Sequence, residues 1–262
     1  MSSRHALVMI VYFGHRWERK KENFVPYEDE NDVYPMVQYQ IESLKKLDPG
    51  VDTDIIIVNN SPNSERAKEL LDGLNGTPAL RGVFRVVNGD NLGGSFGGYN
   101  TAYMSFRGQY DYWFFNEDDV IITRDGFYAD AVDQLQDKSV GFVAINGFDY
   151  IGTKWGYKVN ANHVHGACGC TTAEKLEELI SDKGEIPHAH VDGMEDKRRQ
   201  IAEGELSFTP WFEQQGYRFE MIKGEKPFTR WCHPGGGTIG LDESKWGPGS
   251  CTWILQNDDR LK

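Results

Sequence analysis

The sequence predicts an α/β fold with a mostly parallel central sheet and helices on both of its faces. Three observations lead to this prediction. Short apolar runs alternate with amphipathic helical patterns through the first half of the chain. The apolar runs are nearly continuous, which is typical of strands buried on both faces. Polar clusters follow three of these runs directly, where parallel sheets place their ligand-binding loops.

The elements expected in the first half can be given in chain order. Residues 6–13 form an apolar run that predicts a strand, and a polar loop follows to about residue 31. Apolar residues on one helical face predict a helix over residues 33–47, which Asp48-Pro49-Gly50 ends. Further strands are expected at residues 54–60, 84–88, 110–115 and 140–146, and helices that end near Leu74 and Phe106.

The second half is less regular. We expect a capped helix at residues 171–181, a helix at 208–215 and a strand at 217–222, before a tail rich in Gly and Trp. No linker divides the chain convincingly. We therefore expect a single domain over residues 1–262, with a ligand-binding half (1–125) and a second half (126–262) that completes the site.

Composition and charge narrow the function classes. The formal net charge is -12, which disfavours nucleic acid as a partner. No apolar stretch approaches the length of a membrane span, although peripheral contact with a membrane stays open. The four cysteines do not suggest a disulfide framework, so we expect a cytoplasmic protein.

An acidic cluster at residues 116–119, Asn-Glu-Asp-Asp, directly follows the apolar run Tyr112–Phe115. Carboxylates crowded at a strand end repel one another unless a cation lies between them. Mg²⁺ and Mn²⁺ prefer such oxygen ligands and keep positions for substrate phosphates. The alternative is a solvated acidic turn without a metal.

A glycine-rich segment at residues 91–100, Asn-Leu-Gly-Gly-Ser-Phe-Gly-Gly-Tyr-Asn, precedes a predicted helix. Glycines allow a ligand to approach the backbone closely, and amides at a helix start favour anions. The segment is neither a Walker loop nor a GxGxxG motif, so an ordinary glycine-rich turn is the alternative.

Three features together resemble family-2 glycosyltransferases of the GT-A fold, in the nucleotide-diphospho-sugar transferase superfamily. They are the strand ending Val58-Asn59-Asn60-Ser61, the segment Asn91-Leu92-Gly93-Gly94 and the acidic cluster. The resemblance covers roughly residues 5–125. It departs from the family at two places, because the family usually has an acid where Asn59 or Asn60 stands, and Asp where Asn116 stands. It implies a Rossmann-like GT-A sheet, a nucleotide-diphospho-sugar donor, Mn²⁺ or Mg²⁺, and a metal-binding DXD motif. The implied metal ligands are Asp118 and Asp119. The implied nucleotide-sugar contacts are Val11, Tyr12, Phe13, Asn59, Asn60, Ser61, Asn91, Gly93, Gly94, Asn100, Asn116 and Glu117.

The resemblance continues more loosely in the second half. It implies a catalytic base at Glu205, with Glu203 and Asp192 as alternatives, and a further metal ligand at His233. The implied reaction is an inverting transfer of the sugar to a hydroxyl of a carbohydrate or glycolipid acceptor.

Three other interpretations stay open at this stage. His163, His165, Cys168 and Cys170, with His188 and His190 downstream, could hold a structural zinc, or His163 or His165 could contact a sugar. A sugar-nucleotide nucleotidyltransferase is disfavoured, because only one glycine, Gly14, follows the first strand. A carbohydrate- or metal-binding protein without catalysis is the third, because Leu206 stands where the family has an acid.

Overall fold

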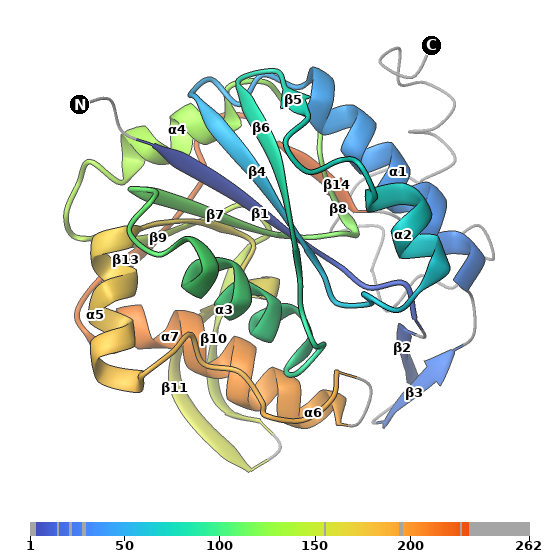
Figure 1. The fold of residues 1–262 in the computed structure, drawn as a ribbon. Helices are drawn as coiled ribbons and strands as arrows, with labels where there is room; N and C mark the ends of the chain where they lie inside the picture. Colours follow the sequence, from blue (N-terminus) through green and yellow to red (C-terminus); the bar gives the residue numbers. More distant parts are fainter. Residues whose placement is uncertain are drawn as a thin grey trace.

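An eight-stranded, mostly parallel sheet forms the centre of the molecule (Figure 1). The computed structural model describes residues 4–14, 16–20, 23–27, 30–154, 156–193, 196–225 and 227–230. The strand order is β13-β9-β12-β7-β1-β4-β6-β5. The bounds in chain order are β1 His5–Val11, β4 Thr53–Asn59, β5 Pro78–Ala79, β6 Gly82–Asn88, β7 Tyr112–Glu117, β9 Val140–Ala144, β12 Gly169–Thr172 and β13 Arg218–Met221.

The sheet is mixed, because β12 and β5 run antiparallel to the strands they pair with. β1 is parallel to both β4 and β7, and β4 is parallel to β6. The carboxyl ends of these four strands therefore meet at one edge. The predicted halves of the chain share the sheet, since β9, β12 and β13 come from the second half.

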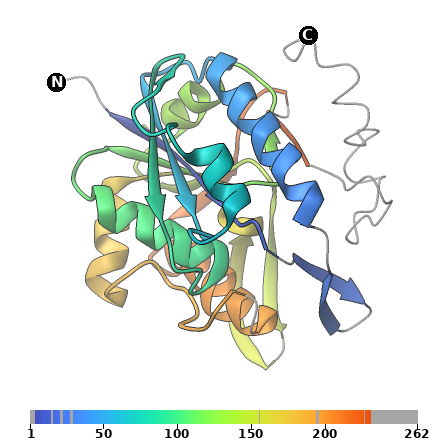
Figure 2. The ribbon, with the colours of Figure 1, turned by 45° about the vertical axis from the view of Figure 1, so that its right-hand side comes forward.

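Helices cover both faces of the sheet, as the sequence predicts (Figure 2). One face packs against α1 (Glu30–Lys46), α2 (Glu65–Leu71) and α4 (Phe127–Gln134). The other face packs against α3 (Gly94–Phe106), α5 (Ala173–Lys183) and α7 (Leu206–Gln214). Alternate residues of β1 enter the two cores: Leu7 and Met9 on one side, Val8 and Ile10 on the other.

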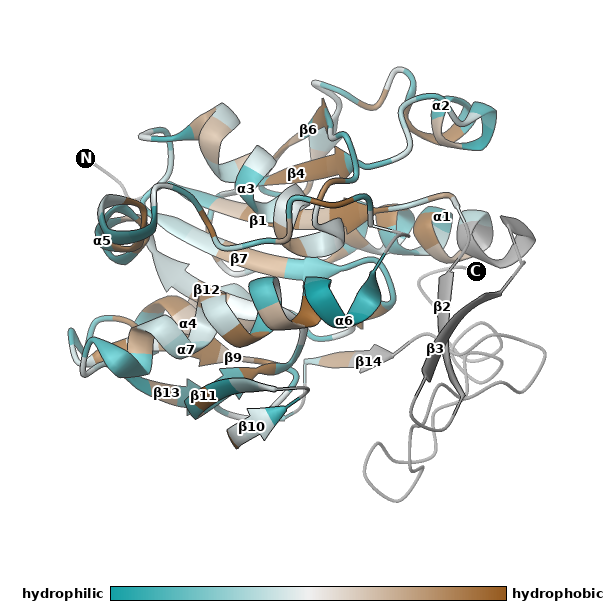
Figure 3. Ribbon diagram, turned by 90° about the horizontal axis from the view of Figure 1, so that it is seen from below, coloured by the Kyte–Doolittle hydropathy of each residue, from teal (hydrophilic) through white to brown (hydrophobic). Residues whose placement is uncertain are grey.

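Burial on both faces explains why the central strands are continuously apolar. Every residue of β1 is buried, and Figure 3 shows β4 as hydrophobic, whereas the short helix α6 (Lys197–Gln200) is hydrophilic. Trp113 of β7 is fully buried beside Tyr103 of α3, with ring centroids 4.9 Å apart. None of the helices within the described residues is both long and apolar enough to cross a bilayer.

The strands and helices predicted for the first half are confirmed, with boundaries shifted by at most three residues. The later helix and strand predictions are also confirmed, as α5, α7 and β13. The α5 helix begins at Ala173 because the Thr172 hydroxyl caps it by accepting a hydrogen bond from the Lys175 amide.

Several elements were missed. The predicted loop before residue 31 contains the hairpin of β2 (Arg16–Lys20) and β3 (Asn23–Tyr27). The second half adds helix α4, the turn η1 (His165–Ala167), and a hairpin of β10 (Phe148–Lys154) and β11 (Tyr157–Val164). Two short strands, β8 (Val120–Ile122) and β14 (Phe228–Arg230), pair with each other. Most of these elements are short or polar, so they lack the long apolar run that marks a buried strand.

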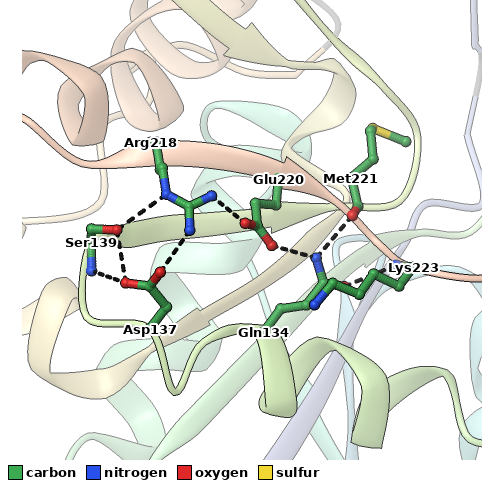
Figure 4. Close-up of polar contacts among 7 residues, drawn as sticks. All are labelled: Gln134, Asp137, Ser139, Arg218, Glu220, Met221 and Lys223. Carbon is green, nitrogen blue, oxygen red and sulfur yellow. Dashed lines mark hydrogen bonds and ion pairs between the residues drawn. The ribbon is translucent and has the colours of Figure 1, made fainter.

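At the outer edge of the sheet, Arg218 of β13 joins neighbouring segments (Figure 4). Its guanidinium donates to the Asp137 carboxylate at 2.7 Å, to the Ser139 hydroxyl at 3.1 Å, and to Glu220. Gln134 of α4 extends the network by donating to the other oxygen of Glu220 at 2.7 Å. This network holds the edge strand β13 against the turn that precedes β9.

The Asp137 carboxylate makes the stability of this edge dependent on pH. Hydrogen bonds from Ser139, followed by the Arg218 guanidinium, lower the pKa of Asp137 to about 2. A lowered folded-state pKa contributes stability above the unfolded pKa of about 4, and this is lost as the pH falls towards 2. We expect Asp137→Asn to be less stable than the parent protein at pH 6 in urea denaturation, and the difference to shrink as the pH falls below 4. A difference that stays constant with pH would contradict this assignment.

Candidate active site

The ends of β1 and β4 are joined by polar contacts. The Asn60 amide donates to the Val11 carbonyl at 2.9 Å, and the Phe13 amide donates to the Ser61 hydroxyl at 3.0 Å. The Asn59 side chain accepts from the Ser61 amide at 2.9 Å and so shapes the turn after β4. Five of the predicted nucleotide-sugar contacts therefore lie together at these two strand ends: Val11, Phe13, Asn59, Asn60 and Ser61.

The glycine-rich segment connects β6 to α3 beside this turn. Asn60 donates its side-chain amide to the Gly94 carbonyl at 3.1 Å. Asn91, Gly93 and Gly94 all have positive φ values, of 61°, 69° and 60°. A methyl group on Gly97 would lie 1.6 Å from the Leu92 carbonyl oxygen, so the tight turn requires glycine there.

A segment from the second half of the chain lies over the glycine-rich segment. Asp192 and Leu92 form an isolated antiparallel bridge, and the Gly93 amide donates to the Val191 carbonyl at 2.8 Å. Asn100 accepts from the Ile186 amide at 3.1 Å, so its side chain fastens this segment to α3. The structure thus brings Asp192 to the same edge of the sheet as the predicted nucleotide contacts.

The acidic cluster at the end of β7 lies next to both features. The Ser95 hydroxyl donates to a Glu117 carboxylate oxygen at 3.0 Å, and the Tyr12 amide approaches Asp118 Oδ2 at 3.4 Å. Asp118 is 5% exposed. Asn116 is fully buried and donates to the Val120 carbonyl at 2.7 Å, which closes the turn that carries the two aspartates.

The Tyr99 phenol lies near the acidic cluster. Burial raises the pKa of Tyr99 well above its ordinary value. The nearby Cys168 and the carboxylates of Glu117, Asp119 and Asp118 raise it further. The Tyr99 hydroxyl donates to the Gly166 carbonyl at 3.0 Å and forms part of the floor below the acids. All three carboxylates therefore contribute to the raised pKa of the Tyr99 hydroxyl.

The acidic cluster offers oxygen ligands, the kind that hard divalent cations prefer, although its three carboxylates are not among the described groups whose ligand atoms all lie within 4.8 Å of one another. The Asp118 and Asp119 carboxylates follow the end of β7 with Glu117, and oxygen ligands of this kind suit Mg²⁺ and Mn²⁺. Removing charged carboxylates from water is costly unless a cation or hydrogen bonds compensate them. The third predicted ligand, His233, lies outside the described residues.

Two of the three candidate bases, Glu203 and Glu205, lie on a distorted helix that packs against α3. Residues Ile201–Glu205 form a π-helical turn, η2, between α6 and α7. Such turns are rare and occur often at functional sites. A methyl group on Gly204 would lie 2.7 Å from the Phe96 ring, so η2 packs closely on α3. Glu203 is held by Arg199, whereas Glu205 faces the end of β11.

Glu205 lies within hydrogen-bond distance of a buried histidine. Its Oε1 lies 3.0 Å from His163 Nε2, and the His163 side chain is 3% exposed. Burial by itself raises the pKa of Glu205, but the hydrogen bond and charge of His163, with His165 and Lys154, outweigh it. The pKa of Glu205 therefore lies below its ordinary value, and the carboxylate is ionised at neutral pH.

Glu205 and Glu117 both approach the turn η1. Gly166 of this turn lies against Glu117, because a methyl group there would be 2.7 Å from Glu117 Oε2. The neighbouring His165 ring lies 5.1 Å from that of His163, which binds Glu205. The structure therefore places the preferred base candidate and the acidic cluster around one short turn.

The zinc interpretation needs correction for the two cysteines. Cys168 and Cys170 are buried, within the same core cluster as residues of α1 and α4. Burial raises the pKa of the Cys170 thiol far above its ordinary value, which disfavours the thiolate that zinc requires. Within the described residues, His163 and His165 group with Asp149, and His188 and His190 group with Glu185.

Several residues around this site were not predicted from the sequence. Ser95, Tyr99 and Gly166 all contact or surround the acidic cluster, and Asp149 meets His163 across the β10–β11 hairpin. Ser95 lies inside the glycine-rich segment, so that motif already pointed to it. Nothing in the local pattern marks Tyr99, Gly166 or Asp149, because their neighbours come from distant parts of the chain.

Comparisons with known proteins show similarity in structure. No protein-family model matches the chain, and no curated protein matches its sequence. A solved structure of mannosyltransferase PcManGT from Pyrobaculum calidifontis, in complex with GDP-Man and Mn²⁺, matches with a TM-score of 0.50 at 15% identity. The match covers 83% of this chain and 54% of that one, so the chain spans about half the length of that protein.

Two further solved structures match over most of both chains. The 4-diphosphocytidyl-2C-methyl-D-erythritol synthase from Anaerococcus prevotii has a TM-score of 0.44 at 10% identity, covering 90% of this chain and 92% of that one. A structure from Bacillus anthracis assigned as a glucose-1-phosphate thymidylyltransferase has a TM-score of 0.48 at 14% identity, covering 87% and 89%. At these identities the similarity concerns the fold.

Proposed function

This chain has the GT-A-like fold of nucleotide-diphospho-sugar transferases, and from that premise we propose that it is a metal-dependent, inverting glycosyltransferase. Its donor would be a nucleotide-diphospho-sugar, and its acceptor a hydroxyl of a carbohydrate or glycolipid. The observation that carries the proposal is the position of Glu117 and Asp118 at the end of β7, beside the glycine-rich segment and the end of β1, with the ionised Glu205 on the neighbouring turn η2.

The donor would lie across the ends of β1, β4 and β6. Tyr12, Asn59 and Ser61 border the place where a base and ribose would bind, and the glycine turn lets the diphosphate approach the backbone. Asp118 and Asp119 would hold the divalent cation, with Glu117 beside them. When bound, the cation neutralises the negative charge that develops on the leaving diphosphate.

Glu205 is the base that the geometry favours. The carboxylate is ionised, and His163 holds its Oε1, so Oε2 can take the proton of an acceptor hydroxyl as that hydroxyl attacks the anomeric carbon. The acceptor oxygen forms the new bond to the anomeric carbon as the bond from that carbon to the diphosphate oxygen breaks, and the nucleoside diphosphate leaves. Glu203 is less suited because Arg199 already engages its carboxylate.

A thermal-shift screen of nucleoside diphosphates with and without Mn²⁺ tests the donor side. Selective binding to the folded state raises the melting temperature by about 5 to 10 °C at ligand concentrations near 100 times Kd. We expect one nucleoside diphosphate to stabilise the protein only when Mn²⁺ is present. The absence of stabilisation by every nucleotide, with and without metal, would overturn the proposal.

Turnover separates the remaining alternatives. Transfer or hydrolysis of a nucleotide sugar supports the glycosyltransferase, and binding without any turnover supports a protein that has lost catalysis. Release of pyrophosphate from a nucleoside triphosphate and a sugar phosphate would instead identify a nucleotidyltransferase.

A further inference from the structure

A second cluster of metal-ligating side chains lies where the β10–β11 hairpin meets the turn η1. Asp149 of β10 and His163 of β11 are direct partners across the hairpin, and His165 follows two residues later. The Asp149 Oδ1 atom lies 3.0 Å from His163 Nδ1 and 3.2 Å from His165 Nε2. One carboxylate oxygen and two imidazole nitrogens therefore lie within 4.8 Å of one another.

The His163 ring is oriented from its other side. It is buried, and its Nε2 lies 3.0 Å from the Glu205 carboxylate, while its Nδ1 faces Asp149. A histidine that donates one ring N–H to a carboxylate presents its second nitrogen in a fixed direction, as is common for histidines that bind metals. His163 thus has an orienting partner before any cation arrives.

We propose that Asp149, His163 and His165 form a binding site for a zinc-class divalent cation with one open coordination position. Ligands at zinc bond lengths in a tetrahedron lie about 3.3 Å apart, close to the two separations in this cluster. Asp149 and His165 are exposed at their side chains, so a cation can reach the cluster from solvent. Three protein ligands leave room for water or a substrate oxygen.

This site differs in chemistry from the acidic cluster at the end of β7. Two imidazoles and one carboxylate favour Zn²⁺, whereas carboxylates alone suit Mg²⁺ and Mn²⁺. In the cation-free structure His163 Nδ1 also lies 3.1 Å from the Asp149 carbonyl oxygen. An imidazole nitrogen binds a metal without its proton, so Zn²⁺ would bind the unprotonated Nδ1 and any proton there would pass to solvent. The inference does not depend on the proposed transfer reaction.

Zinc titration in excess Mg²⁺ tests the site, because Mg²⁺ occupies the oxygen ligands. We expect one Zn²⁺ per chain, measured by competition with a chromophoric chelator. His165→Ala and Asp149→Asn should each weaken the affinity by at least about 10-fold. Both side chains are partly exposed, so the variants should fold. Asp118→Asn should leave the Zn²⁺ affinity unchanged.

Cobalt absorption supplies a second readout that does not involve activity. Co²⁺ bound to nitrogen ligands in a four-coordinate site gives stronger visible bands than octahedral Co²⁺ bound to oxygens. His190→Ala is the matched control, because His190 belongs to the separate cluster with Glu185 and His188. The inference is overturned if no Zn²⁺ binds, if His165→Ala leaves binding intact, or if His190→Ala removes it.

Discussion

Asp118→Asn removes the Mn²⁺-dependent part of nucleotide binding and lowers sugar transfer by at least about 100-fold. Asparagine keeps the shape of the side chain and its contact with the Tyr12 amide, but it lacks the negative charge. The carboxylates at the end of β7 then hold a divalent cation less tightly, and the diphosphate loses its counter-charge. Binding is measured as the Mn²⁺-dependent shift in melting temperature, and transfer as release of the nucleoside diphosphate.

Asp133→Asn on the exposed side of α4 is the matched control for this experiment. It removes the same charge at a distance from the strand ends, so neither measurement should change. A full Mn²⁺-dependent shift in Asp118→Asn would mean that the cation binds elsewhere. Asp119→Asn then shows whether the second aspartate is the principal ligand.

Glu205→Gln lowers transfer by about 100- to 10,000-fold while nucleotide binding with Mn²⁺ stays intact. Glutamine still accepts a hydrogen bond from His163 Nε2, so the packing around the π-helical turn is retained. It cannot take a proton from the acceptor hydroxyl. The loss is therefore expected in kcat, with little change in the KM for the donor.

Glu203→Gln and Asp192→Asn test the competing assignments of the base. Glu203 pairs with Arg199, and Asp192 lies on the segment over the glycine-rich turn. We expect both variants to keep most of the transfer activity. If either loses activity while Glu205→Gln keeps it, the proton acceptor is that residue.

The central strands and the polar groups at their ends were predictable because each depends on local sequence. The run Tyr112–Phe115 is apolar because it is buried on both faces, and a strand so placed delivers the next residues to the edge of the sheet. The same reasoning predicted β1 and β4 with their terminal asparagines. Parallel strands separated by helices have their carboxyl ends at one edge of the sheet. The proximity of these ends can therefore be predicted without knowing the side-chain contacts.

The second half was less predictable because its partners are distant in the chain. The four residues of β12 insert between β7 and β9 with the opposite direction, although the sequence there suggested a metal-binding pair of cysteines. Antiparallel pairing on both sides buries Cys170 in the core. A short strand has too few residues to show a period, so its place depends on the sheet that receives it.

The sequence by itself determined the class of fold and the location of the acidic cluster. The pattern of apolar residues along each element and the polar residues at the strand ends both depend on residues that are close together in the chain. The tertiary structure decided which groups surround that cluster. Ser95 and Tyr12 lie beside the acids, and the Asp192 segment lies over the glycine-rich segment. Glu205 contacts His163, which in turn contacts Asp149. These contacts link residues far apart in the chain, and only the packing of helices and hairpin on a completed sheet brings them within hydrogen-bond distance.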